Sequence, residues 1–294
     1  MPYSLIELIG NTPLVEARVL HQNPDVKLYF KLEGHNPGGS VKDRAALNMI
    51  RSGLERGDFD KSAKLIEATS GNTGIALAMI AGIYGLDIEL VMPENSTVER
   101  VQTMRAYGAK VTLTPSDVGI EGARDYAEAK VKDEGYIMMN QFANKDNWMA
   151  HYRSTGPEIW KDTEGKITHF VSSMGTTGTI MGTSTYLKEQ NPGIQIVGVQ
   201  PTDGSRIPGI RKWPEEYLPK IFDARKVDTV MEVSQEEAEN MARRLAKEEG
   251  IFAGVSSGGA ATVALKLAAS LDNGVIVSIV CDRGDRYLSS DLFT

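Results

Sequence analysis

The stretch from Asn36 to Arg44 places a lysine amine where it could do chemistry. A Pro-Gly-Gly turn at 37–39 precedes Ser40, a candidate cap, and residues 41–50 read as a helix whose first turn contains Lys42. Because the dipole of a helix is positive at its start, a lysine there should lose its proton more readily. The neutral amine is the form that attacks a carbonyl. A solvated lysine at an ordinary helix start is the alternative interpretation.

A second stretch reads Gly-Thr-Thr-Gly-Thr between a predicted strand and a predicted helix. Its members are Gly175, Thr176, Thr177, Gly178 and Thr179. Glycines let a ligand approach the backbone, while free amides at a helix start and hydroxyl groups favour an anion. The pattern therefore indicates a phosphate site, with a plain turn as the alternative. It matches neither a Walker A loop nor a dinucleotide fingerprint.

A third stretch has the same design with an added amide side chain. It consists of Thr69, Ser70, Gly71, Asn72 and Thr73. This loop could hold a second anion, and a substrate carboxylate is the natural candidate. The run Ser256–Gly259 also precedes a predicted helix, but by itself such a run is more often a cap than a ligand contact.

Composition and charge exclude several other classes of protein. The 294 residues carry a net charge of −7 without any basic block, which argues against a nucleic-acid surface. The longest strongly apolar run, residues 275–281, is too short to span a bilayer, and no signal-peptide pattern is visible. The four histidines are scattered and Cys281 has no partner at ligand spacing, so no metal site is predicted. A single cysteine fits a reducing compartment, so we expect the cytoplasm.

Alternating strands and helices must position these loops. Strands are predicted at residues 26–32, 64–68, 88–92, 110–114, 136–139, 169–172, 194–199 and 275–280. Capping-box patterns at Ser96-x-x-Glu99 and Ser234-x-x-Glu237 begin two of the predicted helices, and residues 203–223 interrupt the alternation. The pattern predicts a doubly wound α/β fold in two lobes, with ligand loops at the carboxyl ends of the strands.

An amine at a helix start, a phosphate loop and a carboxylate loop together match what pyridoxal phosphate needs. The chain also resembles the fold-type II pyridoxal-phosphate enzymes, and within them the O-acetylserine sulfhydrylases, or cysteine synthases. The matching blocks are Ile9–Leu14, Lys31–Gly34, Ser40–Arg44, Glu67–Gly74, Arg105–Ala109, Gly254–Gly259 and Cys281–Tyr287. Residues 141–142, 151–152, 155–160 and 207–214, with the Gly-Thr-Thr-Gly-Thr loop, are closer to the B-type isoform.

The resemblance implies a tryptophan synthase β-like fold with the cofactor between two α/β domains. The smaller domain would comprise residues 39–145. Within it, the residues from about 86 to 134 have a βαβα pattern of their own, so we expect this mobile subdomain to close over bound substrate. The larger, cofactor-binding domain would comprise residues 1–38 and 146–294.

The resemblance also implies roles for the site residues. Lys42 would form a Schiff base with pyridoxal 5'-phosphate, Asn72 would bond its ring hydroxyl, and Ser256 would face its pyridine nitrogen. Residues 175–179 would hold the phosphate. The loop 69–73 and Gln141 would bind the substrate carboxylate.

The implied reaction is a β-replacement that makes L-cysteine from O-acetyl-L-serine and sulfide, or S-sulfocysteine from thiosulfate, through an α-aminoacrylate. Lys42 would remove and return the α-proton. A serine at the ring nitrogen makes the ring a weaker electron sink, which suits elimination better than transamination. An O-phosphoserine-dependent cysteine synthase, a serine/threonine dehydratase and a cystathionine β-synthase-like enzyme are alternatives, and an inactive binding protein is a further one.

Three cations, Arg206, Arg211 and Lys212, lie in the irregular stretch after a predicted strand, where ligands collect. We expect Arg211, with Lys212 as the weaker candidate, to admit anionic substrates such as thiosulfate or O-phosphoserine. A homodimer is expected. The residues identify neither the sulfur donor nor a possible sulfur-carrier protein.

Overall fold

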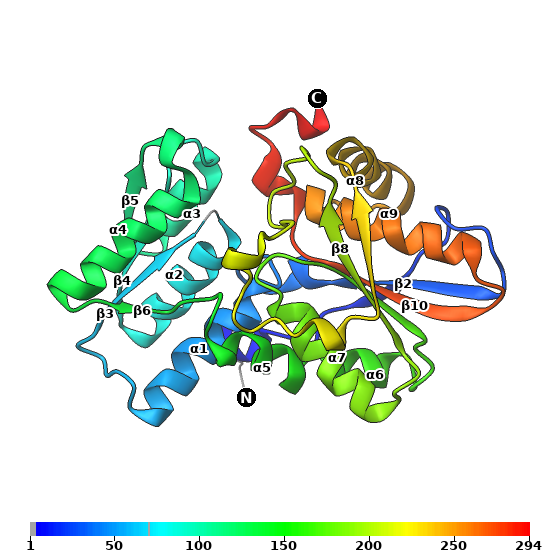
Figure 1. Ribbon diagram of the computed structural model, residues 1–294, viewed down its shortest axis with the longest axis horizontal. Helices are drawn as coiled ribbons and strands as arrows, with labels where there is room; N and C mark the ends of the chain where they lie inside the picture. Colours follow the sequence, from blue (N-terminus) through cyan, green and yellow to red (C-terminus); the bar gives the residue numbers. More distant parts are fainter. Residues whose placement is uncertain (1–3, 70) are drawn as a thin grey trace.

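Two sheets lie next to each other in the computed structural model, which describes residues 4–69 and 71–294 (Figure 1). The larger sheet has the strand order β1-β2-β10-β7-β8-β9, and every neighbouring pair is parallel except β1 with β2. Its strands are β1 (Leu14–Glu16), β2 (Val26–Leu32), β7 (His169–Ser173), β8 (Gln195–Pro201), β9 (Thr229–Val233) and β10 (Gly274–Val280).

The smaller sheet has the order β5-β4-β3-β6 and is parallel throughout. Its strands are β3 (Lys64–Ala68), β4 (Asp87–Pro93), β5 (Lys110–Thr114) and β6 (Ile137–Met138). All four belong to one continuous part of the chain. The larger sheet, in contrast, combines an N-terminal segment with the second half of the chain.

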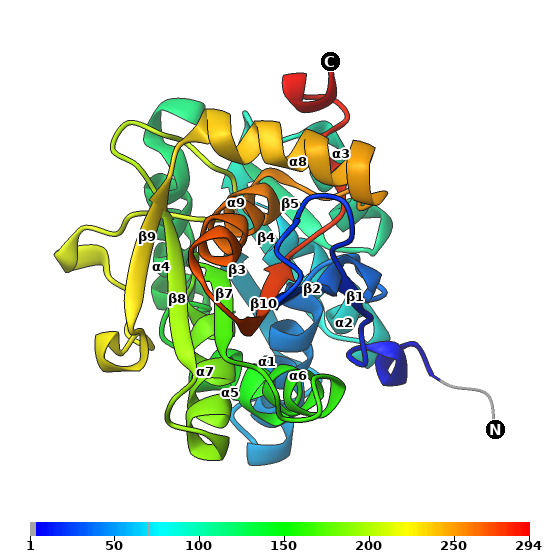
Figure 2. The same cartoon turned by 90° about the vertical axis from the view of Figure 1, so that its right-hand side faces the viewer.

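Helices cover both faces of the larger sheet (Figures 1 and 2). One face packs on α8 (Gln235–Glu249) and α9 (Val255–Ser270), and the other packs on α6 (Thr155–Asp162) and α7 (Gly178–Gln190). Neighbouring residues of β10 show this alternation, because Ile276 packs with the first pair of helices and Val277 with the second. Strands buried on both faces explain the continuous apolar run at 275–280.

The smaller sheet is covered on both faces in the same way. On one face lie α1 (Lys42–Arg56), α2 (Asn72–Tyr84) and α3 (Val98–Ala106), and on the other lies α4 (Gly119–Glu134). Leu65 of β3 packs in the first layer and Ile66 in the second. Helix α5 (Lys145–Arg153) contacts both α1 and α7 and thereby joins the two halves of the molecule.

Short 3-10 helices complete the regular structure. They span Leu5–Leu8, Glu33–His35, Ser116–Val118, Glu215–Tyr217, Ala224–Lys226, Gly284–Tyr287 and Asp291–Phe293. No helix in the described part of the chain is both long and apolar enough to cross a membrane.

The doubly wound fold and the predicted strands are confirmed, with differences at the edges. Strands β1 and β9 were not predicted; both are five residues or shorter and lie at the edges of the sheet, where an apolar pattern is weak. The capping box at Ser234 and Glu237 is confirmed. The one predicted at Ser96 is wrong, because α3 is capped by Thr97, without a side-chain bond.

Each sheet reverses its winding direction at one place, and both places matter for function. In the smaller sheet the reversal lies between β3 and β6, and in the larger it lies between β7 and β10. Loops at the carboxyl ends of strands on either side of such a reversal diverge and leave a crevice, where ligands bind in doubly wound sheets. The loops 69–73 and 175–179 follow β3 and β7, one at each crevice.

Candidate active site

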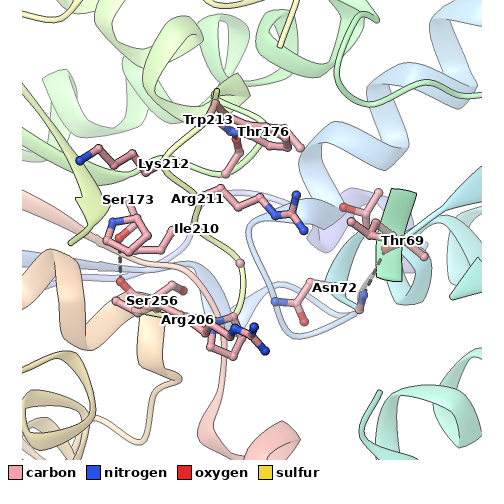
Figure 3. Close-up of a pocket in the computed structure, with 18 of the residues that line it drawn as sticks. Thr69, Asn72, Ser173, Thr176, Arg206, Ile210, Arg211, Lys212, Trp213 and Ser256 are labelled. Atoms are coloured by element: carbon pink, nitrogen blue, oxygen red, sulfur yellow. Dashed lines mark hydrogen bonds between the residues drawn. The ribbon is translucent and has the colours of Figure 1, made fainter. Parts of the chain in front are cut away.

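A cavity of about 1080 Å³ lies between the two sheets and brings most of the predicted site residues together (Figure 3). Of those residues, the ones that line it are Lys42, Thr69, Gly71, Asn72, Thr73, Gln141, Gly175, Thr176, Thr177, Thr179, Arg211 and Ser256. Gly178 is not among the lining residues and packs behind them. Ser70 lies outside the described residues.

Lys42 is the first residue of α1, as the sequence predicts. Its backbone N–H donates to Ser40 Oγ at 3.2 Å, although the cap position itself is occupied by Val41. Burial lowers the pKa of the Lys42 amine, while Cys281 and Asp282 oppose this shift. The surroundings of Lys42 therefore favour the neutral amine, the nucleophilic and basic form.

A buried ion network holds the start of α1 against the larger sheet. Arg44 Nε lies 2.7 Å from Glu33 Oε2, and Arg44 Nη1 lies 2.6 Å from Glu158 Oε1. Lys31 Nζ also pairs with Glu158, at 2.9 Å. Burial raises the pKa of Glu158, but Arg44 and Lys31 outweigh it and bring the pKa to about 2. The network joins the first turn of α1 to β2, to the 3-10 helix after it and to α6. The backbone that carries Lys42 is therefore held in a fixed position.

The loop 175–179 is held from behind by residues far away in sequence. Trp213 Nε1 donates to the Gly175 carbonyl at 2.8 Å, and Asn147 Nδ2 donates to Thr176 Oγ1 at 3.1 Å. Thr177 adopts a left-handed conformation with φ 69° just before α7. These contacts fix the backbone of the loop and leave its other side facing the cavity.

Both glycines of this loop are required by close packing. A Cβ at Gly175 would lie 2.3 Å from the Gly209 carbonyl oxygen, and one at Gly178 would lie 2.1 Å from Asn147 Oδ1. A side chain at either position would therefore push the loop out of place.

His151 supports the last residue of the loop. Its Nε2 lies 3.4 Å from Thr179 Oγ1, and its Nδ1 lies 2.9 Å from Thr155 Oγ1. Burial lowers the pKa of His151 to about 3, so the ring is neutral and contributes hydrogen bonds rather than charge. Neither this role nor that of Asn147 was predicted from the sequence, since both depend on α5 packing against α7.

The loop after β3 is shorter than predicted, because α2 begins at Asn72 and not at Ile75. Thr69 Oγ1 accepts hydrogen bonds from the N–H groups of Gly71 and Gly74, at 3.1 and 3.2 Å. Thr73 Oγ1 donates to Gln141 Oε1 at 2.7 Å. Gln141 thus lies beside this loop.

Asn72 is held by the C-terminal part of the chain. Its Nδ2 donates to Asp282 Oδ2 at 2.7 Å, and its Oδ1 accepts from Arg286. Tyr287 donates its hydroxyl proton to the same Asp282 oxygen at 2.8 Å. These three partners had no predicted role, although they lie in one of the blocks that carry the resemblance.

Ser256 is buried and lies inside α9, which begins at Val255 and is capped by Gly254. The prediction that 256–259 precedes the helix is therefore wrong, because the helix extends one turn further towards the cavity. The Ser256 carbonyl accepts from Ser173 Oγ at 2.7 Å.

Near Ser256, burial raises the pKa of the Cys281 thiol to about 12, so the thiol stays protonated at neutral pH.

The two cations proposed for anion binding differ in position. Both residues line the cavity, but their side chains point in opposite directions, that of Arg211 towards Asn72 (Figure 3). Arg211 Nη1 lies 2.9 Å from Glu121 Oε1 of α4, so an ion pair crosses the cavity between the halves of the molecule. Lys212 pairs with Asp203 and Glu232 at 2.8 and 2.9 Å, which leaves it a weak candidate.

Comparisons with known proteins agree with this geometry. A family model described as "Pyridoxal-phosphate dependent enzyme" matches residues 5–282. The chain belongs to this family. It is 59% identical to cysteine synthase B of Pseudomonas aeruginosa over 99% of this chain and 97% of the relative. It is 55% identical to cysteine synthase B of Escherichia coli, over 99% and 96% of the two chains.

Solved structures share the fold of this chain. The crystal structure of an O-ureido-L-serine synthase superposes with a TM-score of 0.94 at 34% identity and covers 100% of this chain and 95% of its own. The fold-type II architecture and the resemblance to B-type cysteine synthases are therefore confirmed. Pyridoxal phosphate is the cofactor of this family.

The residues of the cavity fit this cofactor. Thr177 Oγ1 is buried and has no hydrogen-bond partner among the described residues. A hydroxyl in this situation is suited to donate a hydrogen bond to a phosphate oxygen of the cofactor. Thr176, Thr179 and the amides at the start of α7 supply further donors without any lysine or arginine in the loop. Lys42 faces the same cavity with a lowered pKa. No cluster of three or more histidine, cysteine or acidic side chains suited to a metal occurs in the described ranges.

Proposed function

We propose that this cavity is the active site of a pyridoxal-phosphate enzyme that forms L-cysteine from O-acetyl-L-serine and sulfide. The observation that carries the proposal is the meeting of Lys42, the loop 175–179 and the loop 69–73 in one cavity. Identity of 59% to a cysteine synthase B over almost the whole chain supports the choice of reaction.

The test compares rates on defined substrate pairs. The purified holoenzyme should form L-cysteine from O-acetyl-L-serine and sulfide faster than it deaminates L-serine or L-threonine, or condenses L-serine with homocysteine. Preferred turnover of L-threonine to a keto acid would identify a dehydratase, and preferred use of homocysteine would identify a cystathionine-forming enzyme. Neither outcome is compatible with the proposal.

Four parts of the cavity would hold the cofactor. Lys42 would hold it covalently through Nζ, and residues 175–179 would hold its phosphate. Asn72 would contact the ring hydroxyl, and Ser256 the ring nitrogen. When bound, pyridoxal phosphate withdraws electrons from the Cα of an amino acid and so acidifies the proton on that carbon.

The chain's own residues orient the amino acid and move its proton. Backbone amides at the start of α2, with Gln141, would bind the α-carboxylate, because amides at a helix start attract anions. The amino group of the substrate would replace Lys42 on the cofactor, and the released Lys42 amine would then take the proton from Cα as acetate leaves Cβ. It would return that proton to Cα after sulfide has bonded to Cβ. A lowered pKa suits both transfers, because a base works best with a pKa near the working pH.

We propose that Arg211 extends the substrate range to anions. Its guanidinium reaches into the cavity, and its planar fork suits sulfonate or phosphate oxygens. Glu121 competes for this guanidinium in the structure, at 2.9 Å, and both partners are about half exposed. Exposed pairs of this kind contribute little free energy, so thiosulfate or the phosphate of O-phosphoserine could displace the carboxylate.

We also propose the domain division 39–145 against 1–38 with 146–294, and movement of residues 86–134 when substrate binds. Two exposed contacts join the halves: the ion pair of Arg211 with Glu121, and the 2.7 Å hydrogen bond from Ser289 Oγ to Glu99 Oε2. Exposed contacts of this kind contribute little free energy, so they can rearrange easily. Crystal structures with and without bound L-serine should show α3 and α4 displaced towards the larger sheet. Unchanged positions in two unrelated crystal forms would contradict the proposal.

We place the enzyme in the cytoplasm as a homodimer. Its single cysteine, Cys281, is partly buried beside the cavity and is suited to a reducing compartment. Apolar side chains exposed near the N-terminus, Leu5 and Leu8, are candidates for an interface between two copies. Light scattering of the purified protein should give twice the chain mass of 32.1 kDa.

A further inference from the structure

Arg100 is a buried cation that no part of the proposed reaction explains. It lies in the first turn of α3, is 9% exposed, and lines the cavity. Its Nε is buried and has no hydrogen-bond partner among the described residues. A largely buried charge whose Nε has no partner among the described residues is costly, which points to an anion that arrives from outside the chain.

The guanidinium of Arg100 packs against the loop that follows β3. A Cβ built at Gly71 would lie 2.7 Å from Arg100 Nε and 3.2 Å from its Cζ. The side chain therefore touches the backbone of Gly71 directly, and glycine is required there because any side chain would overlap Arg100. On another side, Arg100 Cζ lies 5.1 Å from the centre of the Tyr287 ring. The cation is fixed between the loop and an aromatic ring.

The loop itself supplies only neutral groups to an anion. Its described side chains are those of Thr69, Asn72 and Thr73, and Gln141 beside it is also neutral. Hydrogen-bond donors orient a carboxylate, but a nearby full charge adds Coulomb attraction in a low-dielectric site. Arg100 lines the cavity in contact with Gly71 of this loop, where it can supply that charge.

We propose that Arg100 is a positioning residue for the substrate α-carboxylate, acting through Gly71 and the loop 69–73. This inference rests on the proposed function, since it assumes that an amino acid binds at this loop. The bound carboxylate compensates the Arg100 charge, and the charge in turn favours substrates that carry a free carboxylate. Discrimination against esters and amides of the same amino acid follows from this one side chain.

The arrangement also links the carboxylate to the larger sheet. Tyr287, which contacts Arg100, donates to Asp282, and Asp282 accepts from Asn72 of the loop. Glu99, the neighbour of Arg100, accepts from Ser289. Helix α3 therefore meets the C-terminal segment at two consecutive residues. A carboxylate that draws the loop towards Arg100 also favours this contact between the halves of the molecule.

The test compares an amino acid with its methyl ester, which lacks the negative charge of the carboxylate. Dissociation constants of L-serine and of L-serine methyl ester are measured on the holoenzyme by the absorbance change of the bound cofactor and by calorimetry. The variants are Arg100→Met, which removes the charge, and Arg100→Lys, which keeps it but loses the planar contact with Gly71 and Tyr287. Arg105→Met is the matched control, because Arg105 is an exposed cation on the same helix.

For Arg100→Met we expect L-serine to bind at least about tenfold more weakly while the ester changes less than about twofold. Arg100→Lys should give a smaller loss in the same direction, and it decides the matter if the Met variant does not fold. Arg105→Met should change neither constant. If both ligands bind equally more weakly, Arg100 has a purely structural role. If the binding of L-serine is unchanged, Arg100 does not act on the carboxylate. Either outcome overturns the proposal. If wild-type protein shows no response to L-serine, the proposed function has failed instead.

Discussion

The loops 175–179 and 69–73 each follow a parallel strand, each begin a helix, and each offer amides and hydroxyls to the same cavity. They differ in what holds them. The loop 175–179 is fixed by Trp213, Asn147 and His151, all of the larger half of the molecule. The loop 69–73 is held partly by its own Thr69 and partly by Asp282, which belongs to the larger half of the molecule.

This difference matches the two ligands we assign to the loops. A cofactor phosphate stays bound through many turnovers, so its loop gains from rigid support within one half of the molecule. A substrate carboxylate must enter and leave. A loop that is held by both halves of the molecule can couple the binding of this carboxylate to movement of the halves. Two similar sequence patterns thus serve a permanent and an exchanging ligand, and the distinction lies in their neighbours.

The largest expected effect comes from Lys42, which serves both ligands. Lys42→Ala should lower cysteine formation by at least about a thousandfold, because it removes the base that moves the Cα proton. The variant should fold, since alanine is a good helix former at the start of α1. Circular dichroism checks folding, and a rate near that of wild type would refute the role of Lys42.

The rigid loop is tested by its hydroxyls. Thr176→Ala combined with Thr179→Ala should weaken cofactor retention by about 1–3 kcal/mol, because two hydrogen bonds to a charged group are lost. Equilibrium dialysis with fluorescence of the bound cofactor measures this. Unchanged retention would mean that the backbone amides hold the phosphate without help from the side chains.

The exchanging loop should respond in the opposite way. Thr73→Ala removes the hydroxyl that fixes Gln141, so KM for O-acetyl-L-serine should rise about tenfold. Cofactor retention should stay at the wild-type level in the same preparation. A loss of cofactor in Thr73→Ala, equal to that in the double threonine variant, would erase the distinction between the loops.

The most selective effect, limited to anionic substrates, concerns Arg211 and its partner Glu121. Arg211→Ala should lower kcat/KM for thiosulfate or O-phosphoserine by about tenfold and leave sulfide with O-acetyl-L-serine nearly unchanged. Glu121→Gln should raise kcat/KM for the anionic substrate by up to about fivefold, because it frees the guanidinium at the cost of one exposed ion pair. Equal losses with all substrates would show that Arg211 acts on closure instead.

Several elements were predictable because their signals are local. The strands at 26–32, 64–68 and 110–114 coincide with β2, β3 and β5, since each is a short run in which apolar or β-branched residues outnumber the charged ones. The position of Lys42 at a helix start follows from the Pro-Gly-Gly turn before it. The start of α9 was misplaced by one turn, because Gly254 is a weak cap signal beside the serines that follow.

The sequence by itself determined the alternating fold, the lysine at the start of a helix, and two loops suited to anions. Only the tertiary structure decided that Thr73 meets Gln141 across 68 residues, and that Asn72 meets Asp282 across 210. It also decided that Arg211 pairs with Glu121, and that Arg100 packs against Gly71. Helix and strand patterns repeat every few residues, so a short stretch of sequence is enough to predict them. Contacts between distant segments depend instead on the order of strands in the two sheets. That order arises when both cores pack, and no short stretch of the chain contains it.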